Sequence, residues 1–173
     1  DHRDLHSFPT RRSSDLLGHG IALGLGMALG ARLDGLDYLV FVLVGDGELE
    51  EGSNWEAAMA AARHEAGNLV VIVDRNGLQL GGFTEKISRL EPLDQKWQAF
   101  GWNVKTVNGH DIPELMATIA SVRHAQAQPT VVIAHTVKGK GLEIAENKVE
   151  WHYKALTREQ YNALDPELRL EVL

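Results

Sequence analysis

Two uninterrupted apolar runs, each ending in a polar turn, constrain the fold of this chain more than any other feature. Leu39–Val44 leads directly into Gly45-Asp46-Gly47, and Leu69–Val73 leads into Asp74-Arg75-Asn76-Gly77. Continuous apolar runs of this kind are typical of strands buried on both faces of a parallel sheet. Ser53–Ala66 lies between them and is predicted to be a helix. A right-handed crossover then brings both turns to one carboxyl edge of the sheet.

The two turns supply oxygen ligands. Asp46 offers a carboxylate and Asn76 a carboxamide, and the shared sheet edge makes them face each other across a crevice. Such a pair suits Mg²⁺, which keeps few protein ligands and completes its octahedron with phosphate oxygens and water. The sequence therefore predicts a divalent-cation site at this edge.

Helical and strand patterns alternate through the rest of the chain, which predicts a doubly wound, mostly parallel α/β sheet with helices on both faces. Predicted helix starts are a capping box at Ser53 and Glu56, an Asp111 cap with Glu114 behind it, and Thr157 with Gln160. The other expected elements are helices over Ile21–Leu33, Pro92–Phe100 and Pro113–Gln126, strands over Trp102–Val107 and Thr130–Thr136, and a polar loop over Asn76–Arg89.

Composition narrows the class of protein. At 173 residues, with 44% apolar and 24% charged residues, the chain is one ordinary globular domain or a piece of one. Its net charge of −7 argues against a nucleic-acid-binding or anionic membrane-binding surface. No apolar stretch is long enough to span a membrane. The lack of cysteine fits a reducing compartment, so we expect a cytoplasmic protein.

Residues 1–16 differ from the chain that follows. They are rich in basic residues and histidine and lack periodicity, and they resemble a translated sequencing-adapter string. The alternative is a disordered native tail. No signal peptide is indicated, because no apolar region follows the charges. We expect the folded domain to be residues 17–173, truncated at its N-terminus because it lacks a starting methionine.

Several further patterns have simpler explanations than a site. Gly24–Gly30 superficially resembles a dinucleotide fingerprint, but its spacing is wrong and no strand precedes it, so close helix packing is favoured. Lys138–Gly141 lacks the spacing of a nucleotide P-loop, which favours a flexible basic loop. His19 and His135 flank elements near the carboxyl edge. Their proximity to a site stays open.

The acidic residues after Gly47 have two interpretations. Glu48 and Glu50 are explained by an exposed turn before a helix N-terminus, whose dipole favours anions. For Glu51, that interpretation and a functional role are equally favoured. Several carboxylates beside a ligand-binding Asp repel one another, and a metal or a partner's groups would compensate that electrostatic cost.

These residues carry a family resemblance. The two turns, with Glu51-Gly52 and Leu78, resemble the thiamine diphosphate signature of transketolases. Further blocks follow in that family's order: Leu17-Gly18-His19-Gly20, Phe100-Gly101-Trp102, Asn108–Asp111, Pro129-Thr130 and His135–Gly141. The resemblance runs from about Leu17 to about Leu164. It is closest to the short N-terminal subunits of bacterial split transketolases, whose pyrimidine-binding domain is a separate polypeptide.

The resemblance implies the ligands of a cofactor site. Asp46 and Asn76 would give side-chain oxygens to Mg²⁺, for which Ca²⁺ or Mn²⁺ can substitute, and Leu78 would give its backbone carbonyl. Gly45 and Gly47 would lie against the diphosphate of thiamine diphosphate, where a residue without Cβ permits close approach.

The resemblance also implies residues near the reacting atoms. The backbone of Leu17 would approach the aminopyrimidine. Glu51 matches an acidic residue at the subunit interface that communicates with an activating glutamate of the partner. His152 matches a histidine that contacts cofactor and substrate, although the family usually has Gly where Tyr153 stands.

The implied activity is transfer of a two-carbon ketol unit between sugar phosphates in the pentose phosphate pathway. The activating glutamate belongs to the pyrimidine domain, so the expected partner is a C-terminal transketolase subunit, in a dimer or heterotetramer, and this chain alone is expected to be inactive. The alternatives are another thiamine diphosphate enzyme, such as deoxyxylulose-phosphate synthase or a 2-oxo acid dehydrogenase component, or a non-catalytic doubly wound binding domain.

Overall fold

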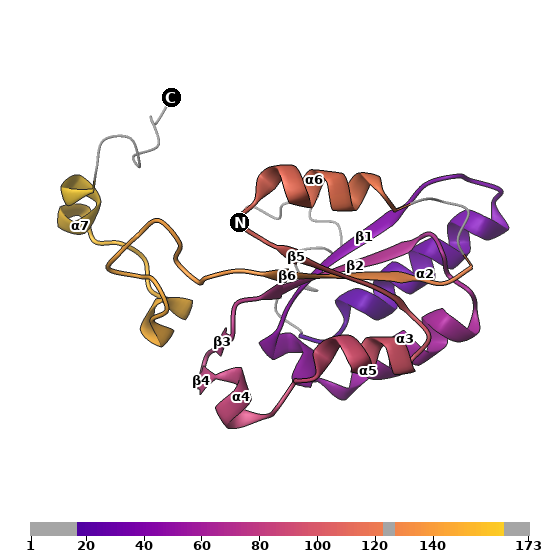
Figure 1. The fold of residues 1–173 in the computed structure, drawn as a ribbon, viewed down its shortest axis with the longest axis horizontal. Helices are drawn as coiled ribbons and strands as arrows, with labels where there is room; N and C mark the ends of the chain where they lie inside the picture. Colours follow the sequence, from indigo (N-terminus) through magenta and orange to yellow (C-terminus); the bar gives the residue numbers. More distant parts are fainter. Residues whose placement is uncertain (1–16, 123–126, 165–173) are drawn as a thin grey trace, which may run out of the picture.

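The fold is built on one parallel sheet. A computed structural model describes residues 17–122 and 127–164 (Figure 1). Within these residues the sheet has four strands in the order β1-β2-β6-β5, and every neighbouring pair is parallel. The strands are β1 (Val40–Gly45), β2 (Leu69–Arg75), β5 (Asn103–Asn108) and β6 (Thr130–His135). The predicted tail at residues 1–16 lies outside the described residues.

Helices cover both faces of the sheet, which confirms the predicted doubly wound α/β class. Figure 1 shows α6 (Ile112–Ala120) on one side and the other three long helices opposite it. Those three are α2 (Gly20–Leu33), α3 (Gly52–Arg63) and α5 (Leu93–Ala99). The larger core cluster lies under this second group and includes a run of packed aromatic rings, Trp102, Trp97, Trp55 and Phe100. None of the helices in the described part of the chain is long and apolar enough to cross a membrane.

The prediction that the first apolar run is buried on both faces is wrong. Val40 and Val44 are buried, but Phe41 and Leu43 are 46% and 72% exposed. The physical reason is topological, because β1 is the edge strand of the described sheet and α2 packs against one of its faces. The second run, in β2, lies between β1 and β6 and is buried almost throughout.

The expected polar loop at Asn76–Arg89 contains regular structure. The strands β3 (Leu78–Gln79) and β4 (Gly82–Phe83) form a short antiparallel hairpin, and α4 (Thr84–Ile87) follows it. The backbone N–H of Thr84 donates to the carbonyl of Gly77 at 3.0 Å, which closes the segment back onto the end of β2. The glycine-rich sequence therefore forms a compact hairpin beside the sheet edge.

The predicted helix caps have mixed outcomes. Asp111 caps α6 by accepting from the N–H of Glu114, and Thr157 with Gln160 forms a capping box for α7 (Arg158–Ala163). The Ser53 cap is wrong, because α3 begins at Gly52 with Glu51 as its N-cap and ends at Arg63. Helix α6 ends at Ala120, and the predicted end at Gln126 lies outside the described residues.

Candidate functional site

The ends of β1 and β2 bring the two predicted turns together. Gly45 pairs with Asp74 in the parallel register, and the N–H of Asp46 donates to the carbonyl of Asp74 at 3.2 Å. Asp46 follows β1, and Asn76 follows β2. Asp46 and Asn76 therefore lie at the same edge of the sheet, as predicted, because parallel neighbours end on the same side.

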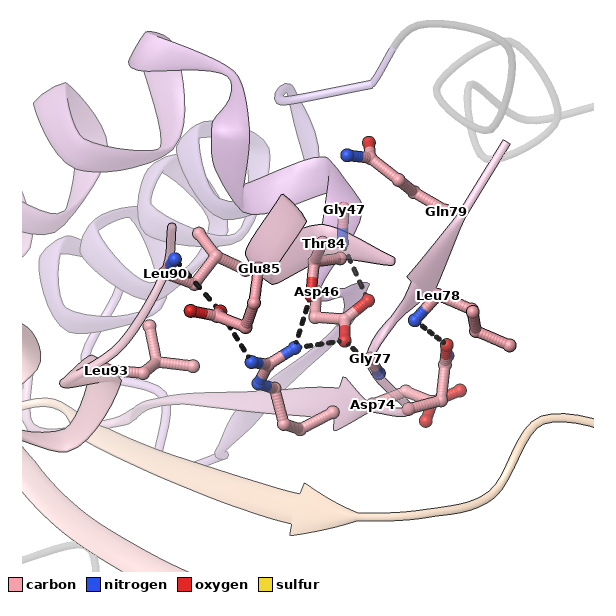
Figure 2. A network of polar contacts seen from close by, with 12 residues as sticks. Asp46, Gly47, Asp74, Gly77, Leu78, Gln79, Thr84, Glu85, Leu90 and Leu93 are labelled. Carbon is pink, nitrogen blue, oxygen red and sulfur yellow. Dashed lines mark hydrogen bonds and ion pairs between the residues drawn. The ribbon is translucent and has the colours of Figure 1, made fainter. Parts of the chain in front are cut away.

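Asp46 is buried and held on both of its carboxylate oxygens. Its exposed fraction is 1%. Oδ1 accepts from the N–H of Gly47 at 2.8 Å, and Oδ2 accepts from the N–H of Gly77 at 2.6 Å and from Nη1 of Arg75 at 2.8 Å (Figure 2). A carboxylate has about four acceptor positions, two on each oxygen. Oδ2 is thus fully used, while Oδ1 keeps one position for a further partner.

Asn76 and Leu78 form the facing turn. Oδ1 of Asn76 accepts from the N–H of Leu78 at 3.0 Å, which leaves that oxygen one more acceptor position. The Leu78 side chain is 2% exposed and anchors the turn in the core. A carboxylate, a carboxamide and a backbone carbonyl are hard oxygen donors, so these residues fit Mg²⁺ with phosphate oxygens and water completing its shell.

The site is not a dedicated all-protein metal cage. No group of three or more His, Asp or Glu side chains suited to a metal ion occurs in residues 17–122 and 127–164. A site with one carboxylate instead suits a cation that arrives with a phosphate ligand, because Mg²⁺ usually keeps several non-protein ligands.

Gly47 has a structural requirement of its own. A Cβ at this position would lie 2.7 Å from Cβ of Gln79, which is closer than real side chains approach. Gln79 also donates from Nε2 to Oε1 of Glu50 at 2.9 Å. The missing side chain therefore lets β3 pack against the turn after β1, in addition to any room it leaves for a diphosphate.

Arg75 is a component of the site that the sequence argument missed. Its side chain is 8% exposed and lies between carboxylates of Asp46, Glu85 and Glu91. Burial alone would lower the Arg75 pKa, but hydrogen bonds and charge attraction from Asp46 and Glu91 outweigh it and raise the pKa above its ordinary value. A charged residue at the end of an otherwise apolar strand was the available signal.

The Leu17-Gly18 turn is fastened to the same edge. The N–H of Gly18 donates to Oε1 of Glu48 at 3.0 Å, and Oε2 of Glu48 is 3.4 Å from the N–H of Gly45. The Ser53 hydroxyl donates to the carbonyl of Gly18 at 2.8 Å, which explains why it does not cap α3. Leu17 itself is 56% exposed. The interpretation of Glu48 as a solvated turn residue is wrong, because it joins two backbone segments.

The two predicted catalytic residues are exposed and lie on different segments. Glu51 is the N-cap of α3, next to Gly18, whose Cβ would lie 2.7 Å from Cβ of Glu51. His152 ends a 3-10 helix, η2 (Val149–His152), which contacts β3. Both segments therefore border the edge that holds Asp46 and Leu78, and the roles of Glu51 and His152 stay predictions.

The other histidines near this edge have local contacts. Nδ1 of His19 is 3.0 Å from the carbonyl of Leu17, and Nε2 of His110 accepts from the N–H of Val137 at 2.7 Å. His135 is exposed at the end of β6 and lines a hollow of about 210 Å³ with Glu91 and Thr106. His110 thus fastens the loop after β6.

Comparison with known proteins assigns the chain to a family. Residues 13–171 match the family model described as transketolase, thiamine diphosphate binding domain. An apulose-4-phosphate transketolase subunit from Phocaeicola vulgatus is 45% identical, over 84% of this chain and 52% of that protein. The 6-deoxy-6-sulfo-D-fructose transketolase subunit SqwG of a Clostridium species is 39% identical, over 90% of this chain and 56% of that protein.

Solved structures agree with the sequence match. Transketolase from Campylobacter jejuni superposes with a TM-score of 0.73 and 28% identity, covering 78% of this chain and 22% of that one. The chain spans about half the length of the two subunits named above. From the matched residues and the shared fold, the chain belongs to the family of thiamine diphosphate-binding domains of transketolases.

Proposed function

We propose that this chain holds the Mg²⁺-diphosphate end of thiamine diphosphate in a transketolase that moves a two-carbon ketol unit from a ketose phosphate to an aldose phosphate. The observation that carries the proposal is the state of Asp46. Its buried carboxylate is fixed by three hydrogen bonds, yet Oδ1 keeps an acceptor position at the sheet edge that also carries the turn of Asn76 and Leu78. Family membership supports the cofactor, and the donor set supports Mg²⁺ as the metal.

The chain's own residues would bind and orient. Asp46, Asn76 and the carbonyl of Leu78 hold the metal, and Gly45 and Gly47 lie against the diphosphate. Thiamine diphosphate, when bound, supplies the nucleophilic carbon that breaks and forms the carbon–carbon bond beside a ketose carbonyl. Leu17 borders the aminopyrimidine, and the N–H of the next residue, Gly18, donates to Glu48.

Glu51 and His152 complete the proposal. Glu51 faces the partner chain and communicates with the glutamate that activates the cofactor, and His152 contacts cofactor and sugar phosphate. Their exposure supports these roles, because residues that meet a partner or substrate must be accessible in the free chain.

The partner would be a C-terminal transketolase subunit or domain, in a dimer or heterotetramer. Two of the relatives are named as transketolase subunits, which supports a divided enzyme. We place the enzyme in the cytoplasm and in the pentose phosphate pathway. The isolated chain is predicted not to transfer ketol units, because the activating glutamate belongs to the partner.

Two matched asparagines test the metal site. Asn76 and Asn108 each accept from the N–H two residues ahead through Oδ1, at 3.0 Å, but only Asn76 lies in the proposed site. Calorimetric titration with thiamine diphosphate, with and without Mg²⁺, should show Mg²⁺-dependent binding by the wild type and by Asn108→Ala, and its loss in Asn76→Ala. Binding by the wild type that ignores Mg²⁺, or equal binding by both variants, would overturn the proposal.

A further inference from the structure

We infer that Arg75 is a positioning residue for the metal ligand Asp46, and that Glu85 and Glu91 balance its charge so that Asp46 stays available to a cation. The inference rests on the proposed function, since it concerns the same Mg²⁺ site. It adds a second layer of contacts, supplied by α4 and the segment after it, to the residues that would touch the metal.

All five N–H donors of the Arg75 guanidinium have a partner. Nη1 donates to Oδ2 of Asp46 and to Oγ1 of Thr84, both at 2.8 Å. Nη2 donates to Oε1 of Glu85 at 2.8 Å and to Oε1 of Glu91 at 3.0 Å, and Nε donates to the same Glu91 oxygen at 3.1 Å. A planar guanidinium fixed at every donor is a rigid support for whatever it holds.

Arg75 decides which oxygen of Asp46 meets the metal. With Arg75 and the N–H of Gly77 on Oδ2, the carboxylate cannot rotate without breaking two charge-assisted or short hydrogen bonds. Oδ1 is then the oxygen left with an open acceptor position. Residues that hold a metal ligand in this way tune affinity without touching the metal.

Without Glu85 and Glu91, the positive charge of Arg75 would cancel the negative charge of Asp46. Arg75 and Asp46 by themselves sum to zero, and a neutral pair attracts Mg²⁺ weakly. Glu85 and Glu91 change the sum: one positive and three negative groups give −2, the charge that a divalent cation neutralises. The side chains of Glu85 and Glu91 are 38% and 50% exposed, so they supply this charge from the rim of the buried pair.

The same contacts tie a distant segment to the site. Oε1 of Glu85 accepts from the N–H of Leu90 at 3.1 Å, and Oε2 of Glu91 accepts from the N–H of Leu93 at 2.9 Å. Thr84 is fully buried and closes onto Gly77. The stretch from α4 to the start of α5 therefore fixes Arg75, which in turn fixes Asp46.

The test compares Arg75→Lys with Arg89→Lys. Lysine keeps the charge but has three donors on a flexible stem, so it cannot hold all four partners of Arg75. Arg89 is exposed and lies outside the network, which makes it the matched control. We expect Arg75→Lys to raise the Mg²⁺ concentration for half-maximal thiamine diphosphate binding about 10- to 100-fold, and Arg89→Lys to leave it unchanged.

Thermal unfolding without cofactor separates positioning from a purely structural role. A structural role would lower the melting temperature of Arg75→Lys and leave its Mg²⁺ requirement at the wild-type value, and that result would overturn the inference. A wild type that binds thiamine diphosphate without regard to Mg²⁺ would instead refute the proposed function itself.

A double variant keeps the inference testable if Arg75→Lys does not fold. Glu85→Gln with Glu91→Gln changes two partly exposed side chains and retains Arg75. The local charge sum then rises from −2 to zero, and we expect at least about a 10-fold higher Mg²⁺ requirement. An unchanged requirement in the folded double variant would overturn the charge-balance argument.

Discussion

Gly24 should be intolerant of a single added methyl group, whereas Gly26 in the same helix should accept one. Helix α2 crosses β1 at Gly24, where an added Cβ would lie well inside van der Waals contact with Cγ2 of Val42 and 3.2 Å from Cδ1 of Leu69. Cγ1 of Val42 already lies 3.3 Å from the Cβ position of Gly20. Val42 therefore cannot turn away from one glycine without approaching the other, and β-branched side chains are stiff.

The expected magnitudes follow from two opposing terms. Replacing Gly with Ala inside a helix stabilises by about 0.5–1 kcal/mol. At Gly26, which is exposed, no described atom other than those of its chain neighbours and its own helix backbone lies within 4 Å of the Cβ position, so this gain should appear in full. At Gly24, overpacking costs about 1–3 kcal/mol. The helix term cancels between the variants, so Gly24→Ala should be less stable than Gly26→Ala by about 1–3 kcal/mol.

Urea denaturation of the two variants, followed by circular dichroism, measures this difference. The midpoints should move in opposite directions from the wild type, with unchanged slopes because the surface exposed on unfolding is the same. Equal free energies of unfolding for Gly24→Ala and Gly26→Ala would refute the reasoning. That result would mean that α2 does not approach β1 as closely as the structure shows.

Two further predictions concern carboxylates. Glu48→Gln replaces one of the two carboxylate oxygens that accept from Gly18 and Gly45 with an N–H donor, so it should lower the free energy of unfolding by about 1 kcal/mol. The control, Glu56→Gln on the exposed side of α3, should leave the free energy of unfolding unchanged. Equal effects of the two substitutions in urea denaturation would contradict the role of Glu48. Burial would raise the pKa of Glu91, but the N–H of Leu93 and the guanidinium of Arg75 outweigh it and hold the pKa below 4.5. Ionised Glu91 therefore stabilises the fold above about pH 4.5, and this contribution is lost as pH falls through the lowered folded-state pKa. At neutral pH the free energy of unfolding of the wild type should exceed that of Glu91→Gln by only about 0.2–1 kcal/mol, because the Glu91 side chain is half exposed. If urea denaturation shows the same difference in acid, the ion pair is not its cause.

The sequence predicted the features that depend on strand order and local chemistry. Continuous apolar runs followed by polar turns placed Asp46 and Asn76 at one sheet edge, because parallel neighbours must end together. The caps at Asp111 and Thr157 were also predictable, since each needs only a short side chain and a backbone N–H three residues away.

Features that depend on distant partners could not be read from the sequence. Ser53 has the spacing of a helix cap, yet its hydroxyl contacts Gly18 because the fold brings that turn within reach. The end of an apolar strand marked Arg75 as unusual but did not indicate its partners, since Glu85 and Glu91 lie 10 and 16 residues away, in and just beyond a stretch predicted to be a polar loop. The exposure of Leu43 likewise depends on which strand ends at the sheet edge.

The burial of Asp46 explains why its supports must be present before any metal arrives. A carboxylate removed from water is costly unless it is hydrogen-bonded and paired. Two backbone N–H groups and Arg75 meet that need within the chain itself, so the ligand is already oriented in the cofactor-free fold. The same support lowers the attraction for a cation, which the rim carboxylates Glu85 and Glu91 restore. Arg75 therefore contributes both to the stability of the free chain and to the orientation of the metal ligand, whereas the partly exposed Glu85 and Glu91 act mainly through their charge. Arg75→Lys should consequently lose more folding stability than the double variant Glu85→Gln with Glu91→Gln.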